Sequence, residues 1–318
     1  MTARDGIRIG TRGSLLARTQ TGWVADQLRA LGHAVTLETI HTSGDERADV
    51  AVPRIGADGV FVRELEAALL AGRIDAAVHS LKDLPTAETD GLALACVPRR
   101  ALPFDVLVSS RHARLASLPP GAVVGTASVR RGLQVRALRG DVDVRPVRGN
   151  VDTRLRRLDA GEYDGLVLAG AGLQRLGLED RITEVLEPDA FWPAVAQGAL
   201  VVQTRMEDAS TRAALAPLDD AATHAAVRAE RSFLASLAGG CLAPIGAWAR
   251  HDAAGALVLG GCVLEDQPVT VRRITASATA GPGEDPEALG RAVAALLKEM
   301  GADRMLAAAR LGGGGHPA

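Results

Sequence analysis

The sequence predicts an α/β protein with two similar, doubly wound α/β domains that face a cleft, followed by a smaller C-terminal α+β domain. Short apolar runs alternate with segments of helical periodicity through most of the 318 residues. This alternation favours an α/β architecture over separate blocks of helices and strands. From Ala222 onward the pattern changes to one helix, three strands and a further helix. A chain of this length can form two or three separate hydrophobic cores.

The first domain is expected to alternate strands with helices. Its expected elements are strands at 7–10, 35–42 and 74–78 and helices at 14–31 and 61–70. Ser14 can cap the first helix. The buried face of that helix is expected to comprise Leu16, Trp23, Leu28 and Leu31. Residues 44–59 are charged and aperiodic, which is typical of an active-site lid and equally of a passive surface loop.

The second and third domains show the same kinds of pattern. In the second domain we expect strands at 105–109, 123–126, 142–147 and 166–169, with helices between them. Asn150 can cap the helix that carries Arg154. In the third domain we expect a helix at 222–237, strands at 245–249, 257–264 and 271–278, and a helix at 286–300.

Arginine is concentrated in the second domain. Residues 128–157 contain nine arginines, three aspartates and no glutamate, although the formal net charge of the whole chain is only -2. Apolar residues at strand and helix spacing interrupt this segment, so we expect it to be folded. A planar guanidinium binds carboxylate or phosphate in a bidentate way, which favours a receptor for a ligand with several negative charges. A solvated, salt-bridged surface is the alternative.

Composition excludes several classes of protein. Aromatic residues make up 3% of the chain, which argues against a platform for stacking single-stranded nucleic acid. No signal segment or apolar run of membrane-spanning length is visible. The three cysteines have no paired spacing, so we expect no disulfide framework and no metal site. We therefore expect a cytoplasmic protein that has no nucleic-acid or membrane partner. We also expect a monomer.

Residues 79–85 follow the expected strand at 74–78 and place the cation of Lys82 beside the carboxylate of Asp83. Ligands of α/β proteins gather at the carboxyl ends of strands. Lys82 can anchor an anion there, and Asp83 can act as a general acid and base or stabilise a developing cation. A helix-start aspartate beside a solvated lysine explains the spacing equally well.

Three further loops combine a helix start with hydroxyl or guanidinium side chains. They lie at 11–14, 125–131 and 149–154. Backbone amides at a helix N-terminus attract anions. One such loop is weak evidence, but three in two α/β domains are consistent with an anionic ligand in the cleft between them.

Cys241 follows two glycines that break the long helix of the third domain. The glycines remove bulk, so the sulfur can project from a loop as a nucleophile or as an attachment point. A small buried residue is the alternative, since most isolated cysteines are of that kind. Cys96 and Cys262 lie in apolar strands and fit that alternative better.

Together these residues resemble the hydroxymethylbilane synthase, or porphobilinogen deaminase, family. The resemblance runs from Ile9 to about Ala247 through all three expected domains. Its most distinctive segments are Ile9-Gly-Thr-Arg-Gly-Ser-Leu-Leu-Ala-Arg-Thr-Gln20, His79-Ser-Leu-Lys-Asp-Leu-Pro85, Arg148-Gly-Asn-Val-Asp-Thr-Arg154 and Gly239-Gly-Cys-Leu-Ala-Pro-Ile245. Departures from residues common in the family are Arg63, Ala127, Val129, Gly132, Ala196 and Gln203.

The resemblance implies a transferase of tetrapyrrole biosynthesis. It joins four porphobilinogen molecules head to tail, releases ammonia and gives hydroxymethylbilane. The chain grows on a dipyrromethane cofactor held as a thioether by the cysteine that matches Cys241, and Asp83 matches the catalytic aspartate. Residues that match cofactor-binding positions are Lys82, Ser128, Arg130, Arg131, Arg154 and Gly170. Residues that match substrate-binding positions are Arg12, Ser14, Gln20, Arg148, Ala169 and Arg175.

The resemblance also implies a type II periplasmic-binding-protein-like fold for the two α/β domains. The first domain would comprise residues 1–100 and 199–217, the second 104–195, and the α+β domain that carries the cofactor cysteine 220–312. A two-lobed anion-binding or solute-binding protein without catalysis is the main alternative, because it has the same architecture. An inactive relative is a second alternative, although Asp83 and Cys241 are both present.

Overall fold

In the computed structural model, the described residues are 6–40, 62–188, 190–238 and 243–312. The chain forms two compact units. The first unit comprises Met1–Ala101 and Gly198–His224, and the second comprises Leu102–Gln197 and Ala225–Ala318. The chain therefore leaves the first unit, returns to it near residue 198, and leaves it again within a helix.

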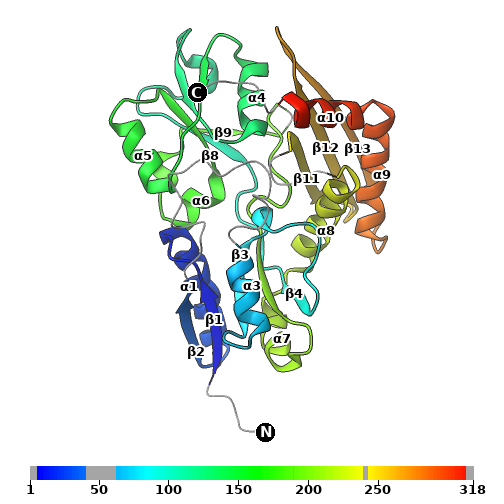
Figure 1. The fold of residues 1–318 in the computed structure, drawn as a ribbon. Coiled ribbons are helices and arrows are strands. Elements are labelled where there is room, and N and C mark those ends of the chain that lie inside the picture. Colours follow the sequence, from blue (N-terminus) through cyan, green and yellow to red (C-terminus); the bar gives the residue numbers. More distant parts are fainter. Residues whose placement is uncertain (1–5, 41–61, 189, 239–242, 313–318) are drawn as a thin grey trace. The chain divides into compact units, whose positions relative to one another are not determined.

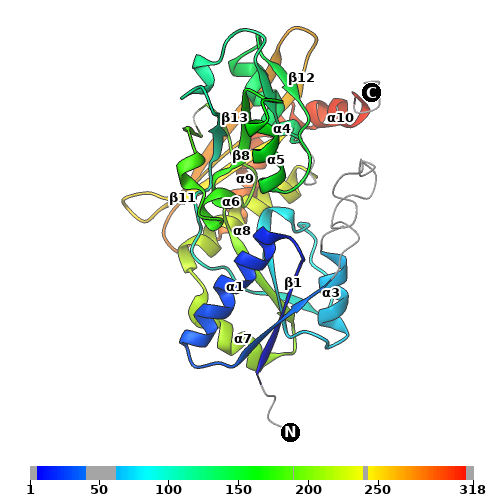
Figure 2. The same ribbon diagram turned by 90° about the vertical axis from the view of Figure 1, so that its left-hand side faces the viewer.

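The first unit is built on a sheet of five described strands in the order β2-β1-β3-β10-β4 (Figure 1). Its strands are β1 (Ile7–Thr11), β2 (Val35–Thr39), β3 (Ala76–Ser80), β4 (Leu92–Cys96) and β10 (Leu200–Arg205). Its helices are α1 (Leu15–Ala30), α3 (Arg63–Leu70) and α7 (Ala209–Leu215), with 3-10 turns at Leu81–Asp83 and Ala216–Leu218. Figure 2 shows α1 and α7 on one face of the sheet and α3 on the other, in agreement with two separate clusters of core residues.

Helix α1 begins as predicted, but its buried face differs from the prediction. The Ser14 hydroxyl caps the helix by accepting a hydrogen bond from the Ala17 amide. Trp23 and Leu31, predicted to be buried, are 45% and 49% exposed. Leu28 is buried as predicted, together with Gln20, Thr21, Val24 and Ala25. Small side chains line this buried stripe because α1 packs closely on the sheet.

Strand β3 also differs from its prediction, by two residues. It covers Ala76–Ser80, so His79 and Ser80 belong to the strand and not to the loop after it. Both pair with β10, which runs antiparallel between β3 and β4, with His79 opposite Val201 and Ser80 opposite Leu200. The long-range pairing with β10 thus extends the strand into polar sequence.

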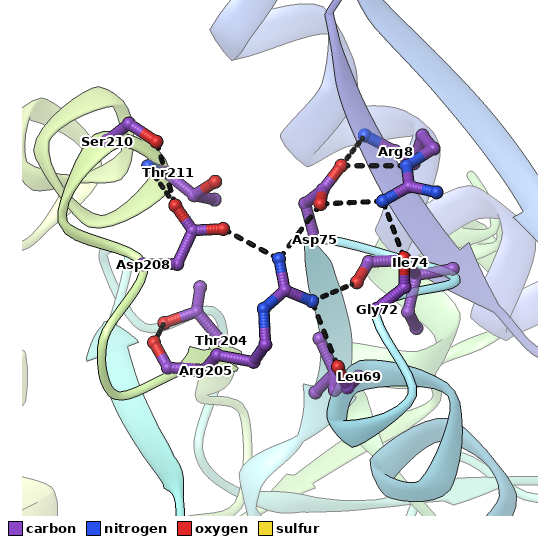
Figure 3. Close-up of polar contacts among 10 residues, drawn as sticks. All are labelled: Arg8, Leu69, Gly72, Ile74, Asp75, Thr204, Arg205, Asp208, Ser210 and Thr211. Carbon is purple, nitrogen blue, oxygen red and sulfur yellow. Dashed lines mark hydrogen bonds and ion pairs between the residues drawn. The ribbon is translucent and has the colours of Figure 1, made fainter. Parts of the chain in front are cut away.

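A cluster of buried charges lies at the opposite end of β3, around Asp75 (Figure 3). Asp75 accepts hydrogen bonds from the guanidinium groups of Arg8 and Arg205, at 2.9–3.0 Å. Arg205 also pairs with Asp208, which caps α7 by accepting a bond from Thr211. The cluster joins β1, the start of β3, the end of β10 and the start of α7.

The α/β part of the second unit contains a sheet of five described strands in the order β7-β6-β8-β5-β9. Its strands are β5 (Asp105–Val108), β6 (Val123–Gly125), β7 (Asp143–Arg145), β8 (Gly165–Ala169) and β9 (Glu184–Leu186). Its helices are α4 (Val129–Leu138), α5 (Val151–Asp159) and α6 (Gly170–Arg175), with 3-10 turns at Leu115–Ser117 and Glu179–Arg181. Strand β9 was not predicted. Core residues of α4 lie on one face of the sheet and those of α5 and α6 on the other.

The two sheets have the same topology, which confirms the predicted pair of similar α/β halves. In each, three strands run parallel, and the next strand, β10 or β5, runs antiparallel to both of its neighbours. In each, the antiparallel strand is the first one after the chain enters that unit from the other.

The C-terminal region forms a small antiparallel sheet in the order β11-β12-β13. Its elements are α8 (Ala221–Ser236), β11 (Ile245–His251), β12 (Leu257–Asp266), β13 (Val271–Ala280), α9 (Pro286–Glu299) and α10 (Ala302–Gly312). The sheet packs against α4 through Leu133, Cys262 and Leu264. Cys96 and Cys262 are buried, as predicted. Across the described residues, no helix is long and apolar enough to cross a membrane.

Candidate active site

In the first unit, two predicted pairs of site residues lie at the same edge of the sheet. Strands β1 and β3 are parallel neighbours, so their carboxyl ends meet at one edge. Arg12 and Ser14 follow β1, and Lys82 and Asp83 follow β3. The topology therefore places a guanidinium, a hydroxyl, an ammonium and a carboxylate on loops at one edge.

Asp83 lies in a short 3-10 turn with buried anchors on both sides. Leu81 and Leu84 are buried, whereas Asp83 is exposed and Lys82 is half-buried. The Leu81 amide donates to the Ala199 carbonyl at 3.0 Å, just before β10. The apolar anchors and this bond fix the turn, and its carboxylate faces outward.

Gln20 lies beneath this edge and is only 4% exposed. Its Nε2 donates to the Ser80 hydroxyl at 3.0 Å. At the next residue of α1, the Thr21 hydroxyl donates to the Thr11 hydroxyl at 3.0 Å. These two bonds fasten α1 to the carboxyl ends of β3 and β1, immediately before the predicted site residues.

His79 is buried one residue before Ser80, and the prediction from sequence assigned it no role of its own. Burial and the positive charge of Arg12 lower the pKa of His79, the side chain of Gln203 opposes them, and the resulting pKa is about 4. The imidazole is therefore neutral at neutral pH. A neutral ring leaves Arg12 as the cation at this point of the edge.

In the second unit, β7, β6 and β8 run parallel, so their carboxyl ends also meet at one edge. Ser128 caps α4 by accepting a hydrogen bond from the Arg131 amide at 3.4 Å. Arg130 and Arg131 follow in the first turn and are only 4% and 8% exposed. The sequence predicted these two arginines as ligand contacts, but not their burial.

Both arginines pair with one buried carboxylate, that of Asp105 at the start of β5. Arg130 Nη1 lies 2.7 Å from Asp105 Oδ2, and Arg131 Nε lies 2.8 Å from Asp105 Oδ1. Burial raises the pKa of Asp105, but the two guanidinium charges lower it by more, so the carboxyl is ionised. Sequence reasoning missed this pairing, because Asp105 lies 25 and 26 positions before the two arginines.

Arg154 adds a third guanidinium to this neighbourhood. Its Nε donates to the Gly149 carbonyl at 2.8 Å. Burial lowers the pKa of Arg154, and the charge of Arg131 lowers it further. Two like charges thus lie close together in a partly buried place. Arg148, in contrast, is exposed.

Ala169 and Gly170 lie where β8 ends and α6 begins, and Ala169 pairs with Asp105 across the sheet. A side chain at Gly170 would overlap Leu102, which explains the glycine. Arg175 is the last residue of α6, and burial lowers the pKa of its guanidinium to about 10.

Comparisons with known proteins agree on one family. The family model described as porphobilinogen deaminase, dipyromethane cofactor binding domain, matches residues 7–213. The model of the porphobilinogen deaminase C-terminal domain matches residues 224–299. The chain belongs to the porphobilinogen deaminase family.

Relatives in this family match over nearly their whole length. The porphobilinogen deaminase of Roseiflexus castenholzii is 48% identical over 306 residues, which cover 96% of this chain and 99% of the relative. That of Mycolicibacterium paratuberculosis is 49% identical over 312 residues, 96% of this chain and 98% of the relative. A solved methionine-binding protein, MetQ, covers 67% of this chain and 89% of its own at 14% identity and a TM-score of 0.43, too distant to support an argument.

Porphobilinogen deaminases are transferases of tetrapyrrole biosynthesis that use a dipyrromethane cofactor. Cys241, the expected attachment point of that cofactor, lies outside the described residues, and so does the candidate lid at 44–59. Of the remaining site residues expected for a porphobilinogen deaminase, most lie at or just after the carboxyl ends of strands in their own unit. Gln20 lies within α1, and Arg175 is the last residue of α6.

Proposed function

We propose that this porphobilinogen deaminase condenses four porphobilinogen molecules head to tail, releases ammonia and yields hydroxymethylbilane, with the residue roles that follow. The observation that carries these roles is the guanidinium cluster of Arg130, Arg131 and Arg154. One carboxylate pairs with two of these three cations. The cluster therefore favours a ligand that brings carboxylates of its own.

The residues present fit the dipyrromethane cofactor. Each of its pyrroles carries two carboxylates, and the partly buried cations of the second unit are suited to accept them. The residues that would hold the group are Lys82, Ser128, Arg130, Arg131, Arg154 and Gly170, with a thioether to Cys241. When bound, the dipyrromethane supplies the pyrrole on which the product chain grows.

Asp83 is the catalytic group of this proposal. Loss of ammonia from porphobilinogen leaves a cation, and an exposed carboxylate held on a fixed turn can stabilise that charge. The same carboxylate can accept and return a proton during bond formation. Leu81 and Leu84 hold the turn in place, so the carboxylate needs no rearrangement when substrate arrives.

Substrate carboxylates are assigned to the remaining cations. The proposed substrate contacts are Arg12, Ser14, Arg148, Ala169 and Arg175. Gln20 contributes through its hydrogen bond to Ser80, which holds the strand end that leads to Asp83. We also infer three domains with the boundaries given above, a monomeric state and a cytoplasmic location without nucleic-acid partners, to be tested by light scattering and fractionation.

Substitution of Asp83 tests the mechanism. Asp83→Asn keeps the shape and removes the charge, so turnover should fall by about 100-fold or more, while the mass of the bound cofactor is retained. Asp90→Asn, a nearby exposed aspartate of the same unit, is the matched control and should turn over normally. Wild-type turnover of Asp83→Asn would remove this residue from the mechanism.

The intact mass of the purified protein tests the cofactor and separates an enzyme from a solute-binding protein. The mass should exceed that of the chain by one dipyrromethane. Cys241→Ser should lack this addition. Persistence of the added mass in Cys241→Ser would identify another anchor, and absence of any addition in the wild type would favour a binding protein.

A further inference from the structure

The second unit contains a fully buried carboxylate, Asp105, to which the proposed reaction assigns no role. It is the first residue of β5 and is 0% exposed. Its Oδ2 accepts from Arg130 Nη1 at 2.7 Å, and its Oδ1 accepts from Arg131 Nε at 2.8 Å. A buried charge of this kind destabilises the folded state unless interactions with its partners offset the free-energy cost of desolvation.

The amide of Gln197 completes the surroundings of Asp105. Gln197 Nε2 donates to Asp105 Oδ1 and to the Pro103 carbonyl, both at 2.9 Å, and its Oε1 accepts from Arg131 Nη2 at 3.2 Å. Both oxygens of Asp105 are thus occupied. The carboxylate is fixed from three sides, so the two guanidinium groups are fixed with it.

The network leaves part of Arg130 for a ligand. Within the described part of the chain, Arg130 makes its hydrogen bonds through Nη1, to Asp105 and to the Trp192 carbonyl. Its Nε–H and both Nη2–H groups remain. Arg131, in contrast, also donates to the Val167 carbonyl and to Gln197. The two neighbouring arginines therefore differ in how many donors the fold itself uses.

Charge balance gives Asp105 a second effect. Arg130, Arg131 and Arg154 carry three positive charges, and the charge of Arg131 already lowers the pKa of Arg154. Without Asp105, mutual repulsion would drive these side chains apart. With it, the net charge of the cluster is +2, and the spacing of Arg130 and Arg131 is set before an anion arrives.

We propose that Asp105 is the positioning residue of the cofactor-binding arginines. It holds Arg130 and Arg131 in the arrangement that accepts the carboxylates of dipyrromethane, and it acts only through those two side chains. The entropy that two flexible arginines would lose on binding the cofactor is lost at the folding stage instead. This proposal rests on the proposed role of the arginines in cofactor binding.

A second buried aspartate offers a matched control for stability. Asp75 in the first unit also bridges two arginines, Arg8 and Arg205, at the opposite end of β3 from Asp83. Asp75→Asn and Asp105→Asn therefore make the same chemical change at a buried aspartate that two arginines share. A purely structural role for Asp105 predicts that the two variants differ little beyond their stability.

The experiment measures the fraction of purified full-length protein that carries the dipyrromethane mass, together with the thermal unfolding midpoint. We expect Asp105→Asn to carry at least fivefold less cofactor than Asp75→Asn when the two variants are compared at similar destabilisation. Equal loading of the two variants would overturn the proposal.

If Asp105→Asn is recovered only as insoluble protein, Gln197→Met replaces it, because it keeps every charge and removes the amide bonds. A loss of at least twofold would then support the proposal, and wild-type loading would overturn it.

The Arg130→Leu variant distinguishes the positioning role of Asp105 from the cofactor-binding role of Arg130. Reduced loading of Arg130→Leu with normal loading of Asp105→Asn would overturn only the positioning role of Asp105. Normal loading of Arg130→Leu would overturn the proposed role of that arginine in holding the cofactor, and the role of Asp105 with it.

Discussion

The charge cluster around Asp75 allows a quantitative prediction of stability. Asp75 accepts from Arg8 and Arg205, and its Oδ2 also accepts from the Arg8 amide at 3.0 Å. Burial raises the pKa of this carboxyl, but the bonds from Arg8 and Arg205 lower it by more, to about 2. Asp75→Asn keeps the shape and removes the charge, so the buried Arg205 and the partly exposed Arg8 lose their shared partner.

The magnitude follows from the pKa. A carboxyl with a pKa of about 2 in the folded chain and 3.8 in the unfolded chain contributes about 2 kcal/mol above pH 4. Because the folded pKa is the lower one, this contribution is lost as the pH falls toward 2, and about 1 kcal/mol is already lost at pH 3. At pH 7, removal of one member of a buried ion pair costs about 3 kcal/mol. Arg205 keeps its bond to Asp208, which places the cost at the lower end of the range.

The assay is urea unfolding, which measures the free energy of unfolding. Hydrogen exchange, read by mass spectrometry of peptides from β1 and β3, then measures the local stability around Asp75. At pH 7 the variant should be about 3 kcal/mol less stable, and the difference from wild type should narrow by about 1 kcal/mol at pH 3. Asp26→Asn, which removes an exposed partner of Arg29, is the control and should cost less than about 1 kcal/mol. A difference that stays constant between pH 7 and pH 3 would refute the assignment of this linkage to Asp75.

Three further predictions concern a buried histidine, a closely packed glycine and two arginines of the second unit. The pKa of His79 is about 4 in the folded chain and 6.5 in the unfolded chain, so the free energy of unfolding should fall by about 3 kcal/mol as the pH drops from 6.5 to 4. The His79→Gln variant should therefore show a flatter dependence of the thermal unfolding midpoint on pH. An unchanged pH dependence would contradict a neutral, buried imidazole. A methyl group at Gly290 would overlap the backbone of α8, so Gly290→Ala should cost about 1–3 kcal/mol in urea unfolding, whereas Gly13→Ala, in open space, should be close to neutral. Replacement of Arg148 or Arg154 by Leu should change the enzyme–substrate intermediates seen by intact-mass spectrometry, and normal elongation in both variants would exclude a shared carboxylate receptor.

Local patterns in the sequence predicted most elements, because each depends on neighbouring residues. The start of α1 follows from the Ser14 cap, and the strands of the C-terminal sheet begin where predicted. The buried face of α1 was predicted correctly at Leu28 and wrongly at Trp23 and Leu31, where apolar character was given more weight than helical spacing. The correct stripe uses Thr21 and Ala25, which are small.

The loops that carry the site residues could be predicted from the sequence, but the residues that pair with those side chains could not. Lys82 and Asp83 were expected just after a strand, and they lie there. The extension of β3 through His79 depends on β10, which is more than 100 residues away in the chain. The pairing of Asp105 with the two arginines of α4 likewise depends on contacts between distant elements. Such contacts leave no periodic signal in the sequence.

The placement of β10 has a consequence for synthesis on the ribosome. The described strands of the second sheet all lie between residues 105 and 186, whereas the first sheet needs Leu200–Arg205 between β3 and β4. A nascent chain can therefore finish the sheet that is encoded later before the one that is encoded first. Until residue 205 has emerged, β3 and β4 have open edges, and open edges invite association with other chains. We expect nascent porphobilinogen deaminase to depend most on chaperones during that interval.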